Sequence, residues 1–222
     1  MRISVIVPAY NESEKITVTV SALKSTLPAA QVIVVDDCST DDTATKVQGK
    51  GVALIRHRRN WGKTAAVCSG LARATGDVIL LIDGDMGRHA REAAKLLVPI
   101  VSGGCDMVIG KFIHSAGGGF GLVRSLASYG ILILTGQRLQ APLSGQRAAK
   151  REVLERCLPG TGGFGLETEL TVRALKRGYV VKEVDTNFVH QGHGKTLQGF
   201  KHRGKQFLAV LGALFRGAAG WR

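Results

Sequence analysis

The sequence has little of what marks several common classes of protein. Its four cysteines are widely separated and no Cys-x-x-Cys occurs, so neither a zinc site nor a disulfide framework is predicted. Aromatic residues make up only 5% of the chain, and no stacking platform or recognition motif for nucleic acid is present. Apolar runs such as 131–134 are far too short to cross a bilayer. We therefore expect a globular protein of a reducing cytoplasm that does not bind nucleic acid.

Acidic residues are scarce as well, with 17 Asp and Glu against 30 Lys and Arg, a net charge of +13. Residues 195–222 contain no acid and hold six of the basic residues: Lys195, Lys201, Arg203, Lys205, Arg216 and Arg222. Apolar residues fall near one face of the same tail: Phe200, Phe207, Leu211, Leu214 and Phe215. A basic amphipathic helix can lie on the inner face of an anionic membrane. It can equally dock on its own domain or on the second subunit of a homodimer; docking is the favoured interpretation, and the apolar segment 122–136 keeps the membrane alternative open.

The order of apolar and polar segments predicts the fold class. Strand patterns cover 3–7, 32–36, 52–56, 78–82 and 107–112, and helical composition covers 12–26, 41–48, 62–74 and 89–101. Such alternation favours one α/β domain with a mostly parallel central sheet flanked by helices. Beyond a glycine-rich stretch at 115–121 and the segment 122–136, we expect a helix at 148–157, a loop at 160–165, a helix at 167–177 and a strand at 179–185.

This order divides the single domain 1–222 into two halves, 1–113 and 114–194, and a tail, 195–222. The second half is expected to cap the first rather than to fold alone. The chain starts directly with a strand pattern and shows no signal-peptide architecture, which agrees with a cytoplasmic location.

Glycine motifs for nucleotides are also missing. The first strand is followed by 8–12, Pro-Ala-Tyr-Asn-Glu, which contains no glycine, so a dinucleotide fold is excluded. Gly62-Lys63-Thr64 and Gly194-Lys195-Thr196 resemble the end of a phosphate loop, but the glycine that this motif requires is replaced by His57 and Val189.

What the sequence does contain is a pair of acids behind a buried strand. Residues 77–85 read Asp-Val-Ile-Leu-Leu-Ile-Asp-Gly-Asp, and the apolar run would deliver Asp83 and Asp85 at its carboxyl end, where open α/β sheets bind ligands. Two hard oxygen donors suit Mg²⁺ or Mn²⁺ on a diphosphate. A plain surface turn is the alternative, since Asp-Gly is common in turns.

Two further motifs follow strands: 8–12 after the first, and 36–41, Asp-Asp-Cys-Ser-Thr-Asp, after the second. With 83–85 they should cluster at one edge of the sheet. Together, and in this order, they resemble the family 2 glycosyltransferases of the GT-A fold, strongly over 1–112 and more loosely beyond.

The resemblance implies which residues bind the nucleotide: Pro8, Tyr10, Asn11, Glu12, Asp36, Asp37, Gly62, Lys63, Asp83 and Gly84. In this family, the loop after the first strand, residues 8–12 here, would line the base and the ribose. Asp37 would hydrogen-bond the base, with Asp36 beside it, and Lys63 would contact a phosphate as a point charge.

For the metal, the resemblance implies Asp83 and Asp85, with His190 as a third ligand and His193 as the competing candidate. A bound Mg²⁺ or Mn²⁺ would neutralise charge growing on the departing nucleoside diphosphate, which makes Asp85 catalytic as well. Lys195, between glycines, would belong to a loop that closes over the phosphates.

The resemblance also implies a catalytic base. Residues 166–173, Leu-Glu-Thr-Glu-Leu-Thr-Val-Arg, resemble the family's Glu-Asp-x-Asp-Leu-x-x-Arg helix, and Glu167 stands at the position of the base that takes the acceptor's proton. Leu166 replaces the preceding acid of that pattern. The alternative is a set of acids near a helix N-terminus, which the helix dipole favours.

A branch of the family, the polyprenyl-phosphate mannosyl- and glucosyltransferases, carries a Ser-Gly-Phe-Arg stretch similar to 144–147, with Gln146 in place of the aromatic residue. Ala141 and Gly87 likewise depart from that branch, which typically has Asp and Gln there. A phosphate acceptor needs no base, and Arg124, Arg147 and Arg151 would then bind it. A small hydroxyl acceptor remains the alternative.

Two rivals belong to other classes. A sugar-phosphate nucleotidyltransferase would carry a glycine-rich, basic loop after the first strand, which is missing here. A non-catalytic nucleotide-sugar-binding protein would not need Asp83, Asp85 and Glu167 intact. We therefore expect a metal-dependent, inverting transfer of a sugar from a UDP- or GDP-sugar to an acceptor.

Overall fold

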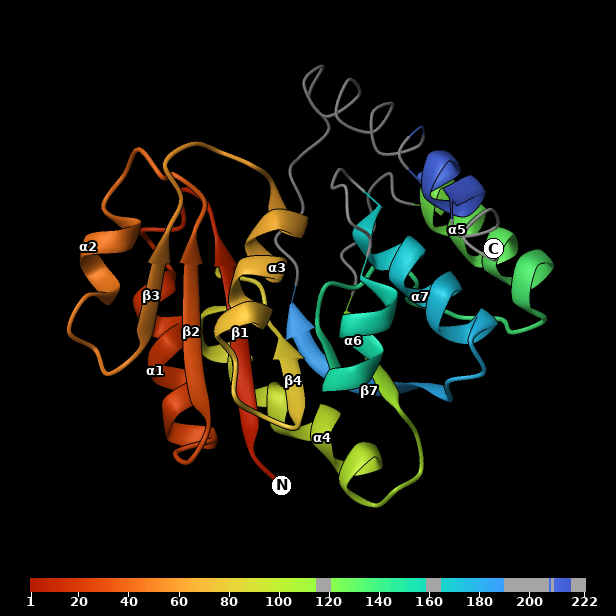
Figure 1. Ribbon diagram of the computed structural model, residues 1–222, viewed down its shortest axis with the longest axis horizontal. Helices are drawn as coiled ribbons and strands as arrows, with labels where there is room; N and C mark the ends of the chain where they lie inside the picture. Colours follow the sequence, from red (N-terminus) through yellow and green to blue (C-terminus); the bar gives the residue numbers. More distant parts are fainter. Residues whose placement is uncertain (115–120, 159–164, 190–207, 209, 217–222) are drawn as a thin grey trace.

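The computed structural model describes residues 1–114, 121–158, 165–189, 208 and 210–216 (Figure 1). Its strands are β1 (Ile3–Ala9), β2 (Gln31–Asp36), β3 (Ala53–Arg56), β4 (Val78–Leu81), β5 (Met107–His114), β6 (Arg147–Lys150) and β7 (Val181–Val189). Its helices are α1 (Ile16–Thr26), α2 (Thr43–Val47), α3 (Lys63–Arg73), the 3₁₀ helix η1 (Gly87–Glu92), α4 (Ala93–Val101), α5 (Gly121–Thr135), α6 (Arg151–Cys157) and α7 (Leu166–Lys176).

The strands form one sheet in the order β3-β2-β1-β4-β6-β5-β7. β1 pairs with β2 and β4 in parallel, β2 with β3, and β5 with β7; only β6 is antiparallel to its neighbours β4 and β5. The predicted class, an α/β domain with a mostly parallel sheet, is confirmed.

The helix expected at 148–157 is partly wrong. Residues 147–150 form β6, and α6 begins only at Arg151. The segment reads Arg-Ala-Ala-Lys, which has a high helix propensity, but hydrogen bonding to β4 on one side and β5 on the other outweighs that propensity. β6 thereby joins the first half of the chain to the second.

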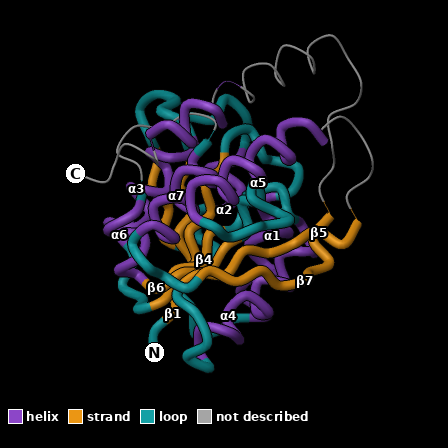
Figure 2. The backbone as a smooth tube through the Cα atoms, turned by 90° about the vertical axis from the view of Figure 1, so that its right-hand side faces the viewer, coloured by secondary structure: helices purple, strands orange, loops and turns teal. Residues whose placement is uncertain are grey.

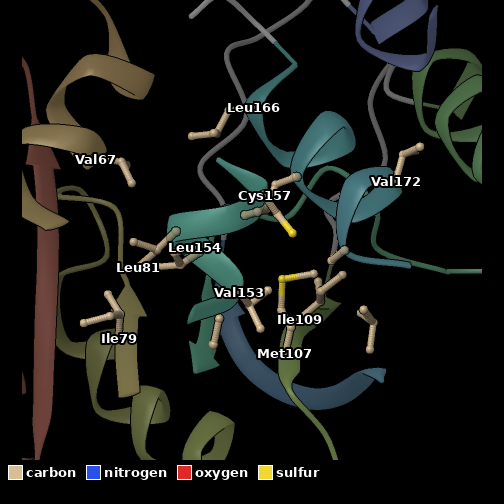
Figure 3. Close-up of a cluster of buried hydrophobic side chains, with 14 of the residues drawn as sticks. Val67, Ile79, Leu81, Met107, Ile109, Val153, Leu154, Cys157, Leu166 and Val172 are labelled. Atoms are coloured by element: carbon tan, nitrogen blue, oxygen red, sulfur yellow. The ribbon is translucent and has the colours of Figure 1, made fainter. Parts of the chain in front are cut away.

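Helices cover both faces of the sheet, which lies between them in Figure 2. Val5 and Val7 of β1 point to a core shared with α1 and α4, whereas Ile6 between them points to a core shared with α3, α5, α6 and α7. Figure 3 shows part of the second core, where Leu154 and Cys157 of α6 meet the sheet. Side chains alternate in this way because successive residues of a strand face opposite sides.

The described part of the tail docks on the chain's own domain. Residues 210–216 lie beside α5 (Figure 1, dark blue), and Leu214 is only 7% exposed. A Cβ on Gly130 of α5 would lie 2.3 Å from Leu214 Cδ1, so the missing side chain allows this close approach. The end is also held by charge, because Arg216 Nε lies 2.9 Å from Glu169 Oε2 of α7. Phe200 and Phe207 lie outside the described residues.

Candidate active site

The loops that follow β1 and β2 are joined at the carboxyl edge of the sheet. Asn11 takes a left-handed conformation, φ 55°, which Asn tolerates better than most residues. Its backbone N–H donates to Ser39 Oγ (3.0 Å), its side-chain oxygen accepts from the backbone N–H of Thr40 (2.9 Å), and Glu12 N–H donates to Thr43 Oγ1 (2.8 Å). Asn11 thus holds the two loops in register.

Asp37 organises the next loop. Its Oδ1 lies 2.6 Å from His57 Nδ1 and accepts the backbone N–H of Trp61 (2.9 Å), while Oδ2 accepts that of Gly62 (2.7 Å). His57 Nε2 lies 2.9 Å from Ser69 Oγ of α3. Because the carboxylate can only accept, His57 donates from Nδ1 to Asp37. The sequence singled out Asp37 but gave no signal for His57 or Ser69 as its partners.

The other residues predicted around the base divide into buried and exposed ones. Asp36 is fully buried, with Oδ1 accepting from Ser39 N–H (3.2 Å) and Oδ2 3.1 Å from Arg56 Nε. Pro8 is buried as well. Tyr10 is 46% exposed and Trp61 50%, and the Trp61 ring lies against His57 (4.8 Å between ring centroids) and beneath the Arg59 guanidinium (5.6 Å to the Trp61 centroid).

Lys63, at the start of α3, links the two halves of the predicted site. Its Nζ lies 2.7 Å from Asp83 Oδ1 and 2.9 Å from Glu167 Oε1, a residue 104 positions away. Burial alone would lower the pKa of Lys63, but these two carboxylates outweigh it and raise that pKa above its ordinary value. Burial likewise would raise the pKa of Glu167, but Lys63 and then Arg147 outweigh it, so the pKa of Glu167 is lowered and the side chain is a carboxylate at neutral pH.

Gln146 holds the other side of Asp83. Its Nε2 donates to Asp83 Oδ2 (2.8 Å), and its Oε1 accepts the backbone N–H of Asp83 (3.1 Å). A Cβ on the preceding Gly145 would lie 2.5 Å from Lys63 Nζ and 2.6 Å from Asp83 Oδ2. Only glycine lets the chain pass so close to both groups. The sequence marked Gln146 merely as a departure from an aromatic residue.

Arg147 lies near this network but inside the protein. Its guanidinium, 1% exposed, donates to Ser144 O (2.8 Å), Thr171 Oγ1 (2.7 Å) and Pro142 O (2.9 Å). Burial lowers the pKa of Arg147 to about 10, against the opposing effect of Glu167. The Arg147 guanidinium thus forms its hydrogen bonds inside the protein, whereas it was expected to bind an acceptor.

Arg151 is not brought to the site. Because β6 runs antiparallel to β4, the chain leaves the Asp83 edge after Arg147 and reaches the opposite edge at Arg151, which donates to Gly76 O (2.9 Å) and Ala74 O (2.6 Å). Arg151 therefore lies at the edge opposite to Asp83, and its contact with an acceptor stays a prediction. Arg124 is exposed on α5. Three other candidates, His190, His193 and Lys195, lie outside the described residues.

The acids of the β4 loop form a corner rich in negative charge. Burial raises the pKa of Glu12 to about 7, and the neighbouring charges of Asp85 and Asp83 contribute to the rise. Gly84 between them is buried, and its carbonyl accepts the hydroxyl of Thr19 (2.8 Å). Within the described ranges no cluster of three or more His, Cys, Asp or Glu side chains could hold a metal ion. The oxygen donors nonetheless fit Mg²⁺ or Mn²⁺, because such an ion keeps waters and takes further oxygens from a diphosphate.

Comparison with known proteins agrees with this geometry. Over 97% of its length the chain is 29% identical to the dolichol-phosphate mannosyltransferase of Pyrococcus furiosus, of which it spans 63%. It is 30% identical to glycosyltransferase AglJ of Haloferax volcanii, over 86% of this chain and 64% of that protein. The chain thus spans less than two thirds of each of these two relatives.

Solved structures give the same picture. Glucosyl-3-phosphoglycerate synthase from Mycobacterium tuberculosis, in complex with phosphoglyceric acid, superposes with a TM-score of 0.81 at 26% identity, over 98% of this chain and 80% of that one. The same enzyme with Mn²⁺, UDP-glucose and phosphoglyceric acid gives 0.79 at 25% identity, with the same coverage. Residues 4–158 match the family described as glycosyl transferase family 2. The chain therefore belongs to glycosyl transferase family 2, and it shares the α/β fold of the solved glucosyl-3-phosphoglycerate synthase.

Proposed function

We propose that this protein transfers a sugar from a nucleotide-diphosphate sugar to an acceptor, with a divalent metal ion and with inversion at the anomeric carbon. The observation that carries the proposal is the contact of Lys63 with both Asp83 and Glu167. This contact joins the acids predicted to hold the donor to the acid predicted to act on the acceptor. Solved relatives in complex with UDP-glucose and Mn²⁺ support the donor class.

In this mechanism Asp83 and Asp85 would hold the metal, which supplies charge neutralisation to the departing nucleoside diphosphate. Tyr10 and Trp61, both partly exposed, are the aromatic side chains that we propose to lie near the base, and Asp37 holds the Trp61–Gly62 backbone in place. Lys63 supplies a positive charge next to Asp83 that a phosphate oxygen can share.

With a hydroxyl acceptor, Glu167 would accept the proton as that oxygen attacks the anomeric carbon in line with the leaving group. Its lowered pKa keeps it ionised at neutral pH, and loss of the Lys63 contact would strengthen it as a base. Its ion pair with Lys63 has to loosen at that moment, and a bound diphosphate gives Lys63 another anionic partner. If the acceptor is a phosphate, it is already ionised and Glu167 serves to position Lys63 instead.

A polyprenyl phosphate at a membrane surface is the acceptor that we propose. Leu122, Tyr129 and Ile133 lie on one face of α5 and are 82%, 57% and 82% exposed; Phe215 of the adjoining tail is 68% exposed. Such a stripe fits the interface of a bilayer, and the Lys- and Arg-rich sequence of 195–222 suits an anionic one. Among the described helices, none has the length and apolar content needed to span a membrane.

The donor is tested by calorimetric titration of UDP and GDP, each with and without Mn²⁺. We expect one nucleotide to bind only with the metal, and Asp85→Asn to weaken that binding at least about tenfold, since one charged ligand is lost. Asp42→Asn is the matched control, because Asp42 is an exposed acid at the start of α2. Equal binding with and without Mn²⁺ would contradict the metal role.

The acceptor is tested separately with the nucleotide sugar so identified. A polyprenyl phosphate in mixed micelles and 3-phosphoglycerate in solution are compared as acceptors. Transfer to the lipid alone, lost in a Leu122→Glu/Ile133→Glu variant that keeps nucleotide binding, supports the membrane acceptor. Transfer to 3-phosphoglycerate alone would replace it by a small phosphate.

A further inference from the structure

One side chain, that of Gln146, forms two hydrogen bonds with Asp83 on the side away from Lys63. Gln146, 1% exposed, donates from Nε2 to Asp83 Oδ2 and accepts the backbone N–H of Asp83 at Oε1. These two bonds close a ring that fixes both the backbone and the carboxylate plane of Asp83. The other oxygen, Oδ1, is thereby turned toward Lys63, 2.7 Å away.

Only an amide satisfies both requirements of this ring. The carboxylate oxygen of Asp83 needs a donor, and the Asp83 N–H needs an acceptor. A carboxylate at position 146 would accept the N–H but repel Oδ2, and an apolar side chain would remove the hydrogen bonds to both groups of the part-buried Asp83. The complementary demands also settle the orientation of the Gln146 amide.

Gln146 is itself held rigidly. Its backbone carbonyl accepts Gly110 N–H of β5 (2.9 Å), and its N–H donates to Ser144 Oγ (3.3 Å). β6 begins at the next residue, Arg147, whose buried guanidinium ties the segment to Thr171 of α7. The amide is therefore presented by the centre of the sheet rather than by a free loop.

We propose that Gln146 is a positioning residue: it holds Oδ2 of Asp83 so that Oδ1 faces Lys63 and the side where the donor's diphosphate and its metal bind. The inference rests on the proposed function for the ligand, but the residue and its role come from this geometry. Gln146 touches neither the donor nor the metal; it acts through Asp83. An aromatic residue in its place could supply neither hydrogen bond.

The test is the affinity for UDP or GDP, whichever the wild-type protein binds, as a function of Mn²⁺ concentration. Gln146→Met keeps the length of the side chain and removes both hydrogen bonds. We expect it to weaken metal-dependent nucleotide binding about tenfold and to raise the Mn²⁺ needed for half-maximal binding, because a hydrogen bond to a carboxylate is lost. Gln137→Met is the matched control: Gln137 donates to Val181 O (2.8 Å), away from Asp83, and its loss should leave both quantities unchanged.

The outcomes separate the two proposals. If the wild-type protein binds neither nucleotide with Mn²⁺, the proposed function fails and this inference falls with it. If the wild type binds and Gln146→Met binds equally well at equal Mn²⁺, the inference alone is overturned. A loss of melting temperature without a shift in the Mn²⁺ dependence would likewise reduce Gln146 to a structural residue.

A second measurement needs no variant. In ¹⁵N-labelled wild-type protein, the side-chain amide of Gln146 should exchange slowly with solvent and shift when Mg²⁺ and the nucleotide bind. Exchange at the rate of an exposed glutamine, or a shift no larger than that of Gln137, would overturn the proposal even if Gln146→Met does not fold.

Discussion

Replacing Lys63 by methionine removes the ammonium that contacts both Asp83 and Glu167 while keeping most of the side chain's volume. In the native protein both carboxylates lie within 3 Å of Nζ, at 2.7 and 2.9 Å. Without it, two negative charges face each other across the place that the ammonium occupied. The native state is therefore expected to lose stability at neutral pH.

The exposure of the three side chains sets the size of this loss. Lys63, Asp83 and Glu167 are 34%, 27% and 17% exposed, so their ion pairs are intermediate between surface and buried ones. Surface ion pairs contribute about 0–1 kcal/mol to stability, and breaking a buried pair costs about 3–5 kcal/mol. We expect a loss of about 1–3 kcal/mol in the free energy of unfolding, or roughly 2–10 °C in melting temperature for a chain of this size.

The pH dependence distinguishes this explanation from loss of packing. The pKa of Glu167 is lowered in the fold, so its contribution to stability is present above its ordinary pKa of 4.5 and is lost as pH falls through the lower, folded value. Lys63→Met removes this contribution. The stability difference between wild type and variant should thus be large near pH 7 and smaller at an acidic pH below the folded pKa of Glu167.

The free energy of unfolding of wild type and Lys63→Met is measured by urea denaturation at these two pH values. Lys95→Met is the control, because Lys95 pairs with Glu92 on the surface and is 49% exposed; a change of about 0.5 kcal/mol or less is expected for it. An equal loss at both pH values, or no loss beyond that of the control, would refute the electrostatic reasoning.

Three other predictions concern the loops and the tail. The pKa of Glu12 is raised in the fold from 4.5 to about 7, so in metal-free buffer the native state binds a proton more tightly than the unfolded chain. Its stability should therefore fall as pH rises between those values. Glu12→Gln should abolish this fall in melting temperature, and an unchanged dependence of melting temperature on pH would contradict the raised pKa. Leu214→Ala should lower the free energy of unfolding in urea by about 2–3 kcal/mol because Leu214 is only 7% exposed. Phe215→Ala is the control: this residue is 68% exposed, and its loss should lower that free energy by about 0.5 kcal/mol or less. Equal effects would show that the tail does not dock in solution. His57→Ala should cost about 1–3 kcal/mol because Asp37 loses a buried donor, compared with an exposed His89→Ala control; similar stability of both variants would argue against the His57 contact.

The sequence predicts those parts of the site that follow from strand direction. Asp37, Asp83 and Glu12 each come directly after a strand, and parallel strands end at one edge, so their proximity needs no knowledge of packing. The bounds of these strands differ from the predicted ones by only a few residues.

The parts that the sequence did not predict depend on β6. Its Ala-rich segment favours a helix, and its pairing partners are decided only when β4 and β5 come together. Without that strand, nothing indicates that Gln146 meets Asp83, 63 positions away. The separation of Arg147 from Arg151 has the same origin, because the four-residue strand between them carries Arg151 to the other edge of the sheet.

The position of β6 also has a consequence for synthesis of the chain on the ribosome. A nascent chain that has reached residue 114 contains β4 and β5, but the strand that separates them is not yet made. Until residue 150 emerges, the facing edges of both strands carry unpaired backbone groups that invite wrong partners. Prematurely terminated products ending within this interval are therefore expected to aggregate.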